Sequence, residues 1–330
     1  MTQGISQTEI GEVLLSPFDL LEGTSESARA KTAEAFLELL GARVRNPNTR
    51  SAYRVAWRSF LAFCSARQLE LENVKAYHVG AWLDQHPGSR STQRQHLAAA
   101  RLLFDSLMMR GVVEYNPASR ARPPRLVRES SHTPVFEEAE IVAFLDSISS
   151  ESLKDIRDRA IFSVLFYSWC RVSALISLTV TDYYERGGTR WLRFQEKRGK
   201  EHEVPVHSKA KEAVDLWLER SHLASNPSAP LFPSFGKNRE TIEQRRLDRR
   251  SVLMLVEKRA RTSGILKRVC CHSFRATGVT EYMNSGGTIE IAQRIAGHTS
   301  PATTRIYDRS GDRLTLEEIE RVQIGKKRQI

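Results

Sequence analysis

A segment rich in proline and arginine, from Asn116 to Pro134, most limits how this 330-residue chain can fold, because it separates two stretches of helical hydrophobic periodicity. It carries four of the 12 prolines, which lack a backbone donor and interrupt helices. The chain is also long for a single compact domain. We therefore expect a flexible arm at residues 1–30, a helical domain at 31–115, a linker at 116–134 and a second domain at 135–330.

The part before the linker has the pattern of a bundle of four or five helices. Ala52, Val55, Ala56, Phe60 and Phe63 recur three or four residues apart, as expected for the buried face of a helix. Basic residues on other faces of these helices, and one lysine of the second part, are candidates for contact with DNA phosphates; a solvated helix face is the alternative. These candidates are Arg50, Arg54, Arg58, Arg90, Arg94, Arg101 and Lys200.

The hydrophobic period changes to two within the second part of the chain. Trp191, Arg193 and Gln195 alternate with Leu192 and Phe194, and a second short stretch, HEVPVH, follows the sequence KRGK. Alternation on both sides of a polar turn predicts a β-hairpin. Helical spacing resumes before and after it. The expected fold is therefore mainly α, with two domains and a small antiparallel β-sheet in the second.

The net charge of +11 favours an acidic partner. Nucleic acid fits best, because a basic surface attracts phosphates and releases counterions on binding. No apolar run approaches the roughly 18 residues of a membrane span, and the N-terminus lacks the layout of a secretory peptide. The four cysteines form no CxxC pattern, which favours reduced thiols. We expect a cytoplasmic, nucleoid-associated protein with no membrane contact.

The stretch HSFRATGVTEYMNSGGTIEIAQRIAGHTSPATTRIYDR gathers His272, Arg275, His298 and Tyr307 without a carboxylate pair or metal-ligand spacing. A phenol, with a pKa near 10, is a poor nucleophile unless its charge is stabilised. Its attack on a phosphodiester makes a phosphotyrosine that keeps the energy of the bond. Guanidinium groups match phosphate oxygens with paired donors and can replace metal ions. The set predicts an attack on DNA phosphate that needs neither metal nor cofactor.

The same residues have simpler explanations. An isolated tyrosine is most often a packing or surface residue. His272 beside Cys270 and Cys271 could suggest a zinc site. Adjacent cysteines rarely ligate one ion together, however, and no second pair of ligands follows, so we expect no metal.

Together these residues resemble the second conserved box of the tyrosine recombinases, the phage integrase family. AGH follows HSFR with its glycine 22 residues after Arg275, and Tyr307 lies nine residues after His298. SWCRVSALISL supplies Arg171 in the context of the family's first box. QEKRGKEHEVPV supplies Lys197 or Lys200 in the family's lysine-bearing turn. The resemblance spans residues 33–325.

Carried over position by position, the resemblance implies a role for each side chain of the set. Tyr307 attacks the scissile phosphate and stays joined to the 3′ phosphate, which frees a 5′ hydroxyl. Arg171 and Arg275 clamp the non-bridging oxygens. His298 adds a hydrogen bond to the phosphate, and His272 helps to transfer a proton.

The resemblance also implies a lysine that protonates the departing 5′ oxygen. Counting back from Val204 favours Lys197, although Lys200 remains the alternative. The sequence departs from the family's usual residues at Trp169, Ala174, Phe274 and Ala276. The first two of these leave open how Arg171 is oriented.

The implied function is that of a site-specific recombinase whose two domains clamp double-stranded DNA at specific recombination sites. Leu316, Ile319 and Val322 form one stripe of a tail helix. In the family such a helix docks on a neighbouring subunit, so we expect a homotetramer of two dimers that passes through a Holliday junction. An accessory DNA-binding protein is included among the expected partners.

The expected biological role belongs to a mobile element, by integration or by cointegrate resolution. The alternatives are a chromosome-dimer-type resolution recombinase and a non-catalytic DNA-binding relative. A type IB topoisomerase and a metal-dependent nuclease are further rivals.

Overall fold

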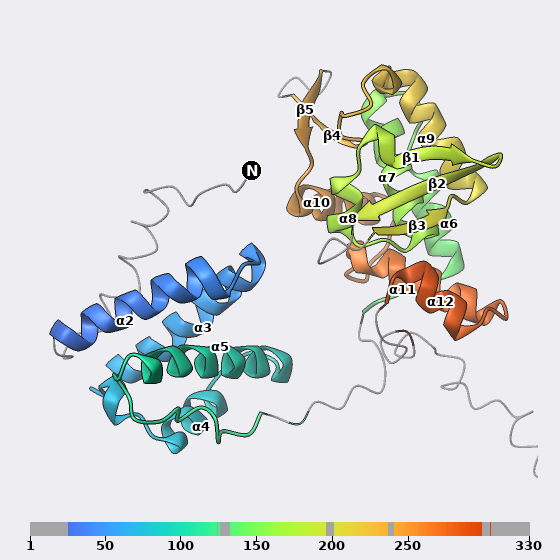
Figure 1. The fold of residues 1–330 in the computed structure, drawn as a ribbon. Coiled ribbons are helices and arrows are strands. Elements are labelled where there is room, and N and C mark those ends of the chain that lie inside the picture. Colours follow the sequence, from blue (N-terminus) through green and yellow to red (C-terminus); the bar gives the residue numbers. More distant parts are fainter. Residues whose placement is uncertain are drawn as a thin grey trace, which may run out of the picture. The chain divides into compact units, whose positions relative to one another are not determined.

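The structure is a computed structural model that describes residues 26–123, 125, 133–195, 201–236, 241–298 and 304. These residues form two compact units, one within residues 1–127 and the other within 128–330 (Figure 1). Each unit has a hydrophobic core of its own. Most described residues are helical, and a small antiparallel sheet lies in the second unit, as the sequence predicts. None of the described helices combines the length and the apolar character needed to cross a membrane.

The first unit is a helical bundle. Its elements are α2 (Glu26–Glu38), which continues as a π-helical turn (Leu39–Arg43), α3 (Pro47–Ser65), a 3₁₀ turn (Leu71–Asn73), α4 (Ala76–Asp84) and α5 (Arg90–Met109). Polar caps fix where the longer helices begin. Asn46 accepts a hydrogen bond from the backbone N–H of Asn48 (2.9 Å), and Ser89 accepts one from Thr92 (3.2 Å). Gly111, with φ +66°, follows the end of α5.

The buried face of α3 is rotated from the predicted one. Phe60 is fully buried, but Val55 is 58% exposed, so its predicted burial is wrong. Trp57 takes the inward position, at 1% exposure, and its indole donates a hydrogen bond to the Ala99 carbonyl (2.8 Å). Two positions along a helix are about 200° apart, so turning Trp57 inward places Val55 on the opposite side.

The two ends of the first unit also differ from prediction. α2 begins at Glu26, inside the expected arm, because the residues that follow it are strong helix formers. At the other end, the first residues of the expected linker pack on α5. The amide of buried Asn116 donates to the Arg101 carbonyl (2.9 Å) and the Asp105 carboxylate (2.6 Å), and its oxygen accepts from the Ala118 N–H (2.9 Å).

The second unit contains the remaining elements, described here in chain order. They are α6 (Glu138–Asp146), α7 (Leu153–Ser168), α8 (Val172–Ser177), a 3₁₀ turn (Val180–Asp182), β1 (Tyr183–Arg186), β2 (Thr189–Gln195), β3 (Glu201–Pro205), α9 (Ser208–Ser221), a 3₁₀ turn (Leu223–Ser225), β4 (Pro233–Phe235), β5 (Ile242–Arg246), α10 (Arg249–Thr262), α11 (Cys271–Asn284) and α12 (Ile289–Ala296).

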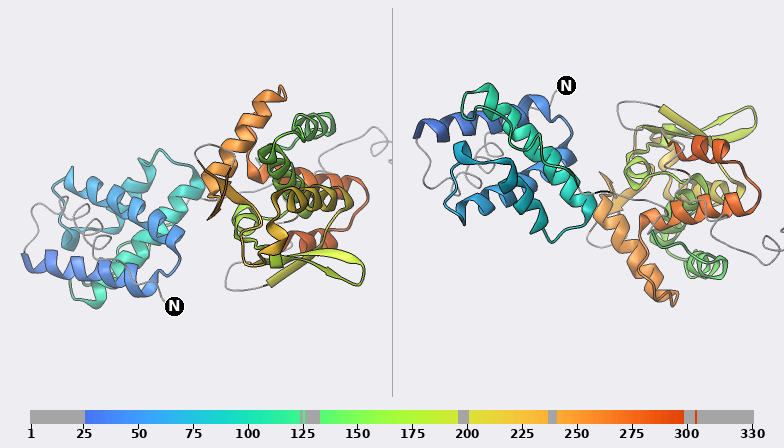
Figure 2. Two further views of the ribbon diagram at one scale, coloured as in Figure 1. Left: turned by 90° about the horizontal axis from the view of Figure 1, so that it is seen from above. Right: turned by 90° about the horizontal axis from the view of Figure 1, so that it is seen from below.

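α7 is the central helix of this unit and packs against α9 and α11, while α11 and α12 lie side by side (Figure 2). Phe144, Phe162 and Phe274 form an aromatic cluster at the core, with the rings of Phe162 and Phe274 stacked at 5.6 Å. Since α11 carries two candidate active-site residues, this packing fixes its position against α7.

The strands of the predicted hairpin are present. β1, β2 and β3 form an antiparallel sheet, and the last described pair of β2 and β3 is Gln195 with Glu201. Leu192 and Phe194 are buried as their period of two predicts. The turn that carries the KRGK sequence lies outside the described residues. A second pair of strands, β4 and β5, was not predicted from the sequence.

Candidate active site

Two candidate residues project from the start of α11. His272 and Arg275 lie three positions apart, so they share one face of the helix. Cys270 is the residue directly before α11. Its backbone N–H donates a hydrogen bond to the Ser273 hydroxyl (3.1 Å), which satisfies one of the unpaired donors near the helix start. The first turn is therefore held in one conformation, and the directions of both side chains are fixed with it.

Arg275 is buried, at 2% exposure, and its guanidinium joins two other elements. One terminal nitrogen donates to the carbonyl of Trp169, just after α7, and the other donates to the carbonyl of Ala296 at the end of α12 (2.5 Å). A charge removed from water is tolerated when it is hydrogen-bonded in this way. The guanidinium is therefore a cation whose position is fixed in advance.

His298 follows directly from the end of α12. Gly297 ends the helix in the left-handed region (φ +61°), and the His298 N–H donates to the Gln293 carbonyl (3.0 Å). The side-chain amide of Gln293 donates to the His298 carbonyl in return (3.1 Å). The buried imidazole uses Nδ1 to contact the hydroxyl of Thr304 (2.8 Å), which is itself fully buried.

Arg171 is the residue before α8, and it acts electrostatically on both histidines. The pKa of His298 is lowered to about 3, mainly by burial and then by the nearby charges of Arg275, Arg171 and His272. The pKa of His272 is also lowered, first by loss of hydration and then by Arg275 and Arg171. The structure thus brings together two permanent cations and two imidazoles that are neutral at neutral pH.

Trp169 explains how the chain accommodates its departure from the family pattern. It takes the left-handed conformation (φ 54°) that favours glycine, the family's usual residue here. Its indole lies against Gly278 of α11, where an added Cβ would stand 2.2 Å from the indole nitrogen and 2.7 Å from the Phe166 carbonyl oxygen. Gly278 therefore provides the room that the large side chain needs.

Three predicted catalytic or DNA-binding residues, Tyr307, Lys197 and Lys200, lie outside the described residues, and so does the predicted tail helix. Their roles stay predictions. Thr304, which contacts His298, is the described residue nearest to Tyr307 in the sequence.

Cys271, which precedes His272, is a poor candidate for a nucleophile. Burial raises the pKa of the Cys271 thiol to about 12, so it stays protonated at neutral pH. Within the described part of the chain, no group of three or more histidine, cysteine, aspartate or glutamate side chains is placed to hold a metal ion.

The predicted DNA-binding arginines of α3 differ in their surroundings. Arg54 and Arg58 are exposed, whereas Arg50 is half-buried and donates Nε–H to the Val44 carbonyl (2.5 Å). In α5, Arg90 and Arg94 are exposed, and Arg90 also donates to a backbone carbonyl, that of residue 125 (3.3 Å).

Arg101, the last of the predicted set, has a structural contact. Its guanidinium donates to the carbonyls of Ala118 (3.1 Å) and Ala121 (2.8 Å), and so ties the segment after α5 to that helix. Periodicity places a residue on a helix face, but it does not reveal which backbone atoms approach that face from elsewhere.

A cavity of about 650 Å³ adjoins His272 and shows two basic residues that were not among the site candidates. Its lining includes Cys270, His272 and the start of α10, where Arg249 and Arg250 are exposed. Cations in the first turn of a helix oppose its dipole, so two adjacent arginines are unfavourable for the helix itself. This unfavourable placement, in a run of basic residues, makes both arginines candidate contacts for an anion.

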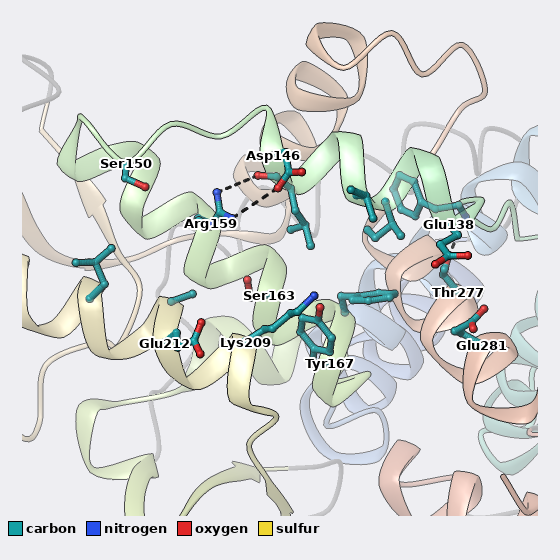
Figure 3. Close-up of a pocket in the computed structure, with 17 residues that line it drawn as sticks. Glu138, Asp146, Ser150, Arg159, Ser163, Tyr167, Lys209, Glu212, Thr277 and Glu281 are labelled. Carbon is teal, nitrogen blue, oxygen red and sulfur yellow. Dashed lines mark hydrogen bonds and ion pairs between the residues drawn. The ribbon is translucent and has the colours of Figure 1, made fainter. Parts of the chain in front are cut away.

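A second cavity, of about 720 Å³, lies away from these residues (Figure 3). It is lined by residues of α6, α7, α9 and α11, including Glu138, Arg159, Tyr167 and Lys209, and Arg159 pairs with Asp146 at its edge. None of the four clustered arginine and histidine side chains lines it. It is therefore separate from the candidate active site.

The chain matches the model of the phage integrase family over residues 134–313, and that of the phage integrase N-terminal SAM-like domain over residues 33–111. It is 32% identical over 268 residues to the tyrosine recombinase XerC of Pelobacter propionicus, with 79% of this chain and 84% of the relative covered.

Solved structures give the same fold. The XerH site-specific recombinase, bound to a palindromic difH substrate in a post-cleavage complex, matches with a TM-score of 0.67 and 16% identity over 98% of this chain and 99% of the other. A lambda integrase tetramer bound to a Holliday junction matches with a TM-score of 0.61 and 15% identity over 91% and 90% of the two chains.

The packing of Trp169 on Gly278 gives a first prediction. Gly278→Ala should lower the free energy of unfolding by about 1–3 kcal/mol, because the added methyl group overpacks this contact. Trp169→Gly also costs stability, because it removes a buried ring. The loss in the double variant should still be smaller than the sum of the two single losses, since the indole that the methyl group would overpack is gone. Thermal unfolding of both single variants and the double variant measures the coupling.

Gly80→Ala in α4, where nothing lies within 4 Å of the added Cβ, is the matched control and should not destabilise the protein. Additive effects of the two substitutions would contradict the contact.

The lowered pKa of His298 gives a second prediction. The unfolded chain takes up a proton near pH 6.5, whereas the folded protein does so near pH 3, so stability falls as pH drops below about 6.5. Between pH 7 and pH 5 this histidine alone should remove about 2 kcal/mol. His298→Gln, which does not titrate, should lose about 2 kcal/mol less over that interval in denaturant unfolding. An equal loss in both proteins would show that His298 titrates normally.

Proposed function

We propose that this chain, which belongs to the phage integrase family and is a tyrosine site-specific recombinase, cuts and rejoins DNA through a bond between Tyr307 and the 3′ phosphate. The observation that carries the proposal is the group of two guanidinium ions and two neutral imidazoles at the ends of α7, α11 and α12. Such a group can bind a phosphate and stabilise the negative charge that builds up on it during phosphoryl transfer.

The proposed roles of the cluster follow from its charges. Attack by the phenol on phosphorus builds negative charge on the non-bridging oxygens, and Arg171 and Arg275 stabilise it with charge-assisted hydrogen bonds. His298, neutral before the phosphate arrives, donates a hydrogen bond to one of these oxygens. His272 accepts the proton of the Tyr307 phenol. A fixed guanidinium such as Arg275 needs little reorganisation at the moment of reaction.

Chain connectivity supports the role of Tyr307. Thr304 is buried against His298, and three residues of chain reach at most about 11 Å. This short reach supports the assignment of the nucleophile's role to Tyr307.

The departing 5′ oxygen needs a proton. We assign this role to Lys197, with Lys200 as the alternative, because both belong to the loop between β2 and β3. The phosphotyrosine bond retains the energy of the phosphodiester, so a 5′ hydroxyl from a partner strand can attack it and restore the backbone. The proposed reaction uses no ATP, metal ion or cofactor.

The proposed partner is double-stranded DNA with specific recombination sites, at the nucleoid in the cytoplasm. The two units, joined by the segment after α5, would clamp the duplex, with Arg54, Arg58 and Arg94 as candidate phosphate contacts of the first unit. Phosphate contacts position a protein on DNA but do not read its sequence.

We also propose that four protomers act together through the predicted tail helix and exchange two pairs of strands by way of a Holliday junction, with an accessory DNA-binding protein as a further partner. The likeness to the lambda integrase tetramer on such a junction supports this arrangement. For the biological role we propose a mobile element, because Trp169 and Ala174 depart from the usual residues around the first arginine. The second candidate is the resolution of chromosome dimers.

Covalent trapping tests the central proposal. DNA sites are first selected from randomised duplexes with the Tyr307→Phe protein, and the recovered site is then prepared with a nick beside the scissile phosphate. The wild-type chain should form an adduct that survives detergent and maps to Tyr307, also in the presence of a chelator. Tyr307→Phe should bind this DNA but form no adduct. No adduct in the wild-type protein, or one at another residue, would overturn the proposal, and relaxation of supercoils without recombination would favour a topoisomerase.

The basic start of α10 gives a prediction about affinity. Replacing both Arg249 and Arg250 with alanine should weaken binding and reduce the slope of log affinity against log salt by about 2, since each phosphate contact contributes roughly 0.9. Fluorescence anisotropy at several salt concentrations measures that slope. Arg220→Ala, an exposed arginine at the end of α9, is the matched control and should leave the slope unchanged. An unchanged slope in the double variant would place α10 away from DNA.

A further inference from the structure

His202 of β3 makes a long-range contact that was not predicted from the sequence. Its half-buried ring places Nε2 2.9 Å from the carbonyl oxygen of Ile295, in the last turn of α12. A carbonyl oxygen can only accept, so Nε2 carries the proton in this contact. His202 therefore points toward α12, on the same face of β3 as buried Val204.

The contact completes the hydrogen bonding at the end of α12. The last four carbonyls of a helix have no partner within it. Here the Gln293 carbonyl accepts from the His298 N–H (3.0 Å), and the Arg294 carbonyl accepts from the Gly297 N–H (3.2 Å). The remaining two accept from side chains of other elements, Ile295 from His202 and Ala296 from Arg275.

The end of α12 is therefore held from two sides. Arg275 reaches it from α11, and His202 reaches it from the hairpin. His298 leaves the helix at the residue after Gly297, so its position depends on both contacts.

On the hairpin side, His202 lies next to the last described pair of the β2–β3 ladder. That pair, Gln195 and Glu201, is exposed, and its side chains contact each other (3.0 Å). The five residues between them include Lys197 and Lys200. His202 thus links β3, the strand that follows the lysine-bearing loop, to the end of α12, which is followed by His298.

We infer that His202 is a positioning residue that keeps the general-acid lysine of the β2–β3 loop aligned with the phosphate held by His298 and the two arginines. The inference rests on the proposed function, because it requires a lysine that protonates the departing 5′ oxygen. His202 itself touches no reacting atom. Through its hydrogen bond to the Ile295 carbonyl, it keeps the lysine-bearing loop in a fixed position relative to His298 and the two arginines.

Changing the leaving group of the DNA from oxygen to sulfur distinguishes a role in aligning the lysine from a merely structural role of His202. In a DNA site whose bridging 5′ oxygen is replaced with sulfur, attack by Tyr307 breaks the P–S bond. The group departs as a thiolate without a proton, because thiols ionise near pH 8.5, as cysteine does. Loss of alignment of the acid should therefore slow cleavage of ordinary DNA and have little effect on the sulfur-containing site.

The experiment compares adduct formation by wild type, His202→Ala and His202→Gln on the two substrates, using the full chain and the site selected with Tyr307→Phe. His202→Ala should slow cleavage of ordinary DNA about 10- to 100-fold, since small misplacements of reacting groups cost on the order of 10²-fold. It should cleave the sulfur site at close to the wild-type rate. His202→Gln, whose amide can also donate, should restore most of the loss. His207→Ala, on an exposed histidine just beyond β3 that stacks on Tyr167, should match the wild type on both substrates.

The outcomes that overturn the inference are distinct. Wild-type rates for His202→Ala on both substrates, or equal slowing on both, would exclude a role in aligning the acid. Absence of any tyrosine adduct from the wild-type protein would instead overturn the proposed function. Circular dichroism and melting of each variant show whether equal slowing comes from loss of the fold.

Discussion

The buried guanidinium of Arg275 is the interaction on which the arrangement of the second unit depends. A buried cation without hydrogen-bond partners is costly, and here two backbone carbonyls accept hydrogen bonds from the guanidinium. Both carbonyls lie at the C-terminal ends of helices, α7 and α12, where the helix dipoles are negative. Burial lowers the pKa of both His272 and His298, and the positive charge of Arg275 lowers both further, so the two imidazoles are uncharged at neutral pH. The same two contacts also bring the end of α7, which leads into Arg171, next to the end of α12.

Trp169 shows how such a centre tolerates a change in its surroundings. A large residue in the left-handed conformation costs energy, and structures keep such residues where the surrounding contacts compensate. Here the carbonyl of Trp169 accepts a hydrogen bond from Arg275. The indole ring of Trp169 packs in a small cluster with Ala276, Val279 and Ala296. Ala276, another departure from the family pattern, is fully buried in that cluster. The two departures are therefore parts of one packing arrangement, which leaves the guanidinium contacts intact.

Much of this could be predicted from the sequence, and the failures have a common cause. Helical spacing identified the bundle, and the period of two identified β2 and β3, because both depend on neighbours along the chain. The resemblance placed Arg171, His272, Arg275 and His298 in one site, although periodicity alone would not have joined three separate helix ends. The burial of Val55 was wrongly predicted, and the contacts of Arg101 and His202 were not predicted, because the surroundings of these residues are set by atoms distant in sequence. The roles of Tyr307 and of the loop lysines stay predictions.

The attachment of the segment after α5 has a consequence for how the two units share a ligand. The Arg125 carbonyl is bonded to Arg90 in the first unit, and Val135 already packs in the second, so nine residues of chain separate them. A segment of nine residues spans at most roughly 35 Å even when fully extended. Once either unit has captured a long polyanion, the other meets it at a high effective concentration, and contacts that are weak in isolation become sufficient.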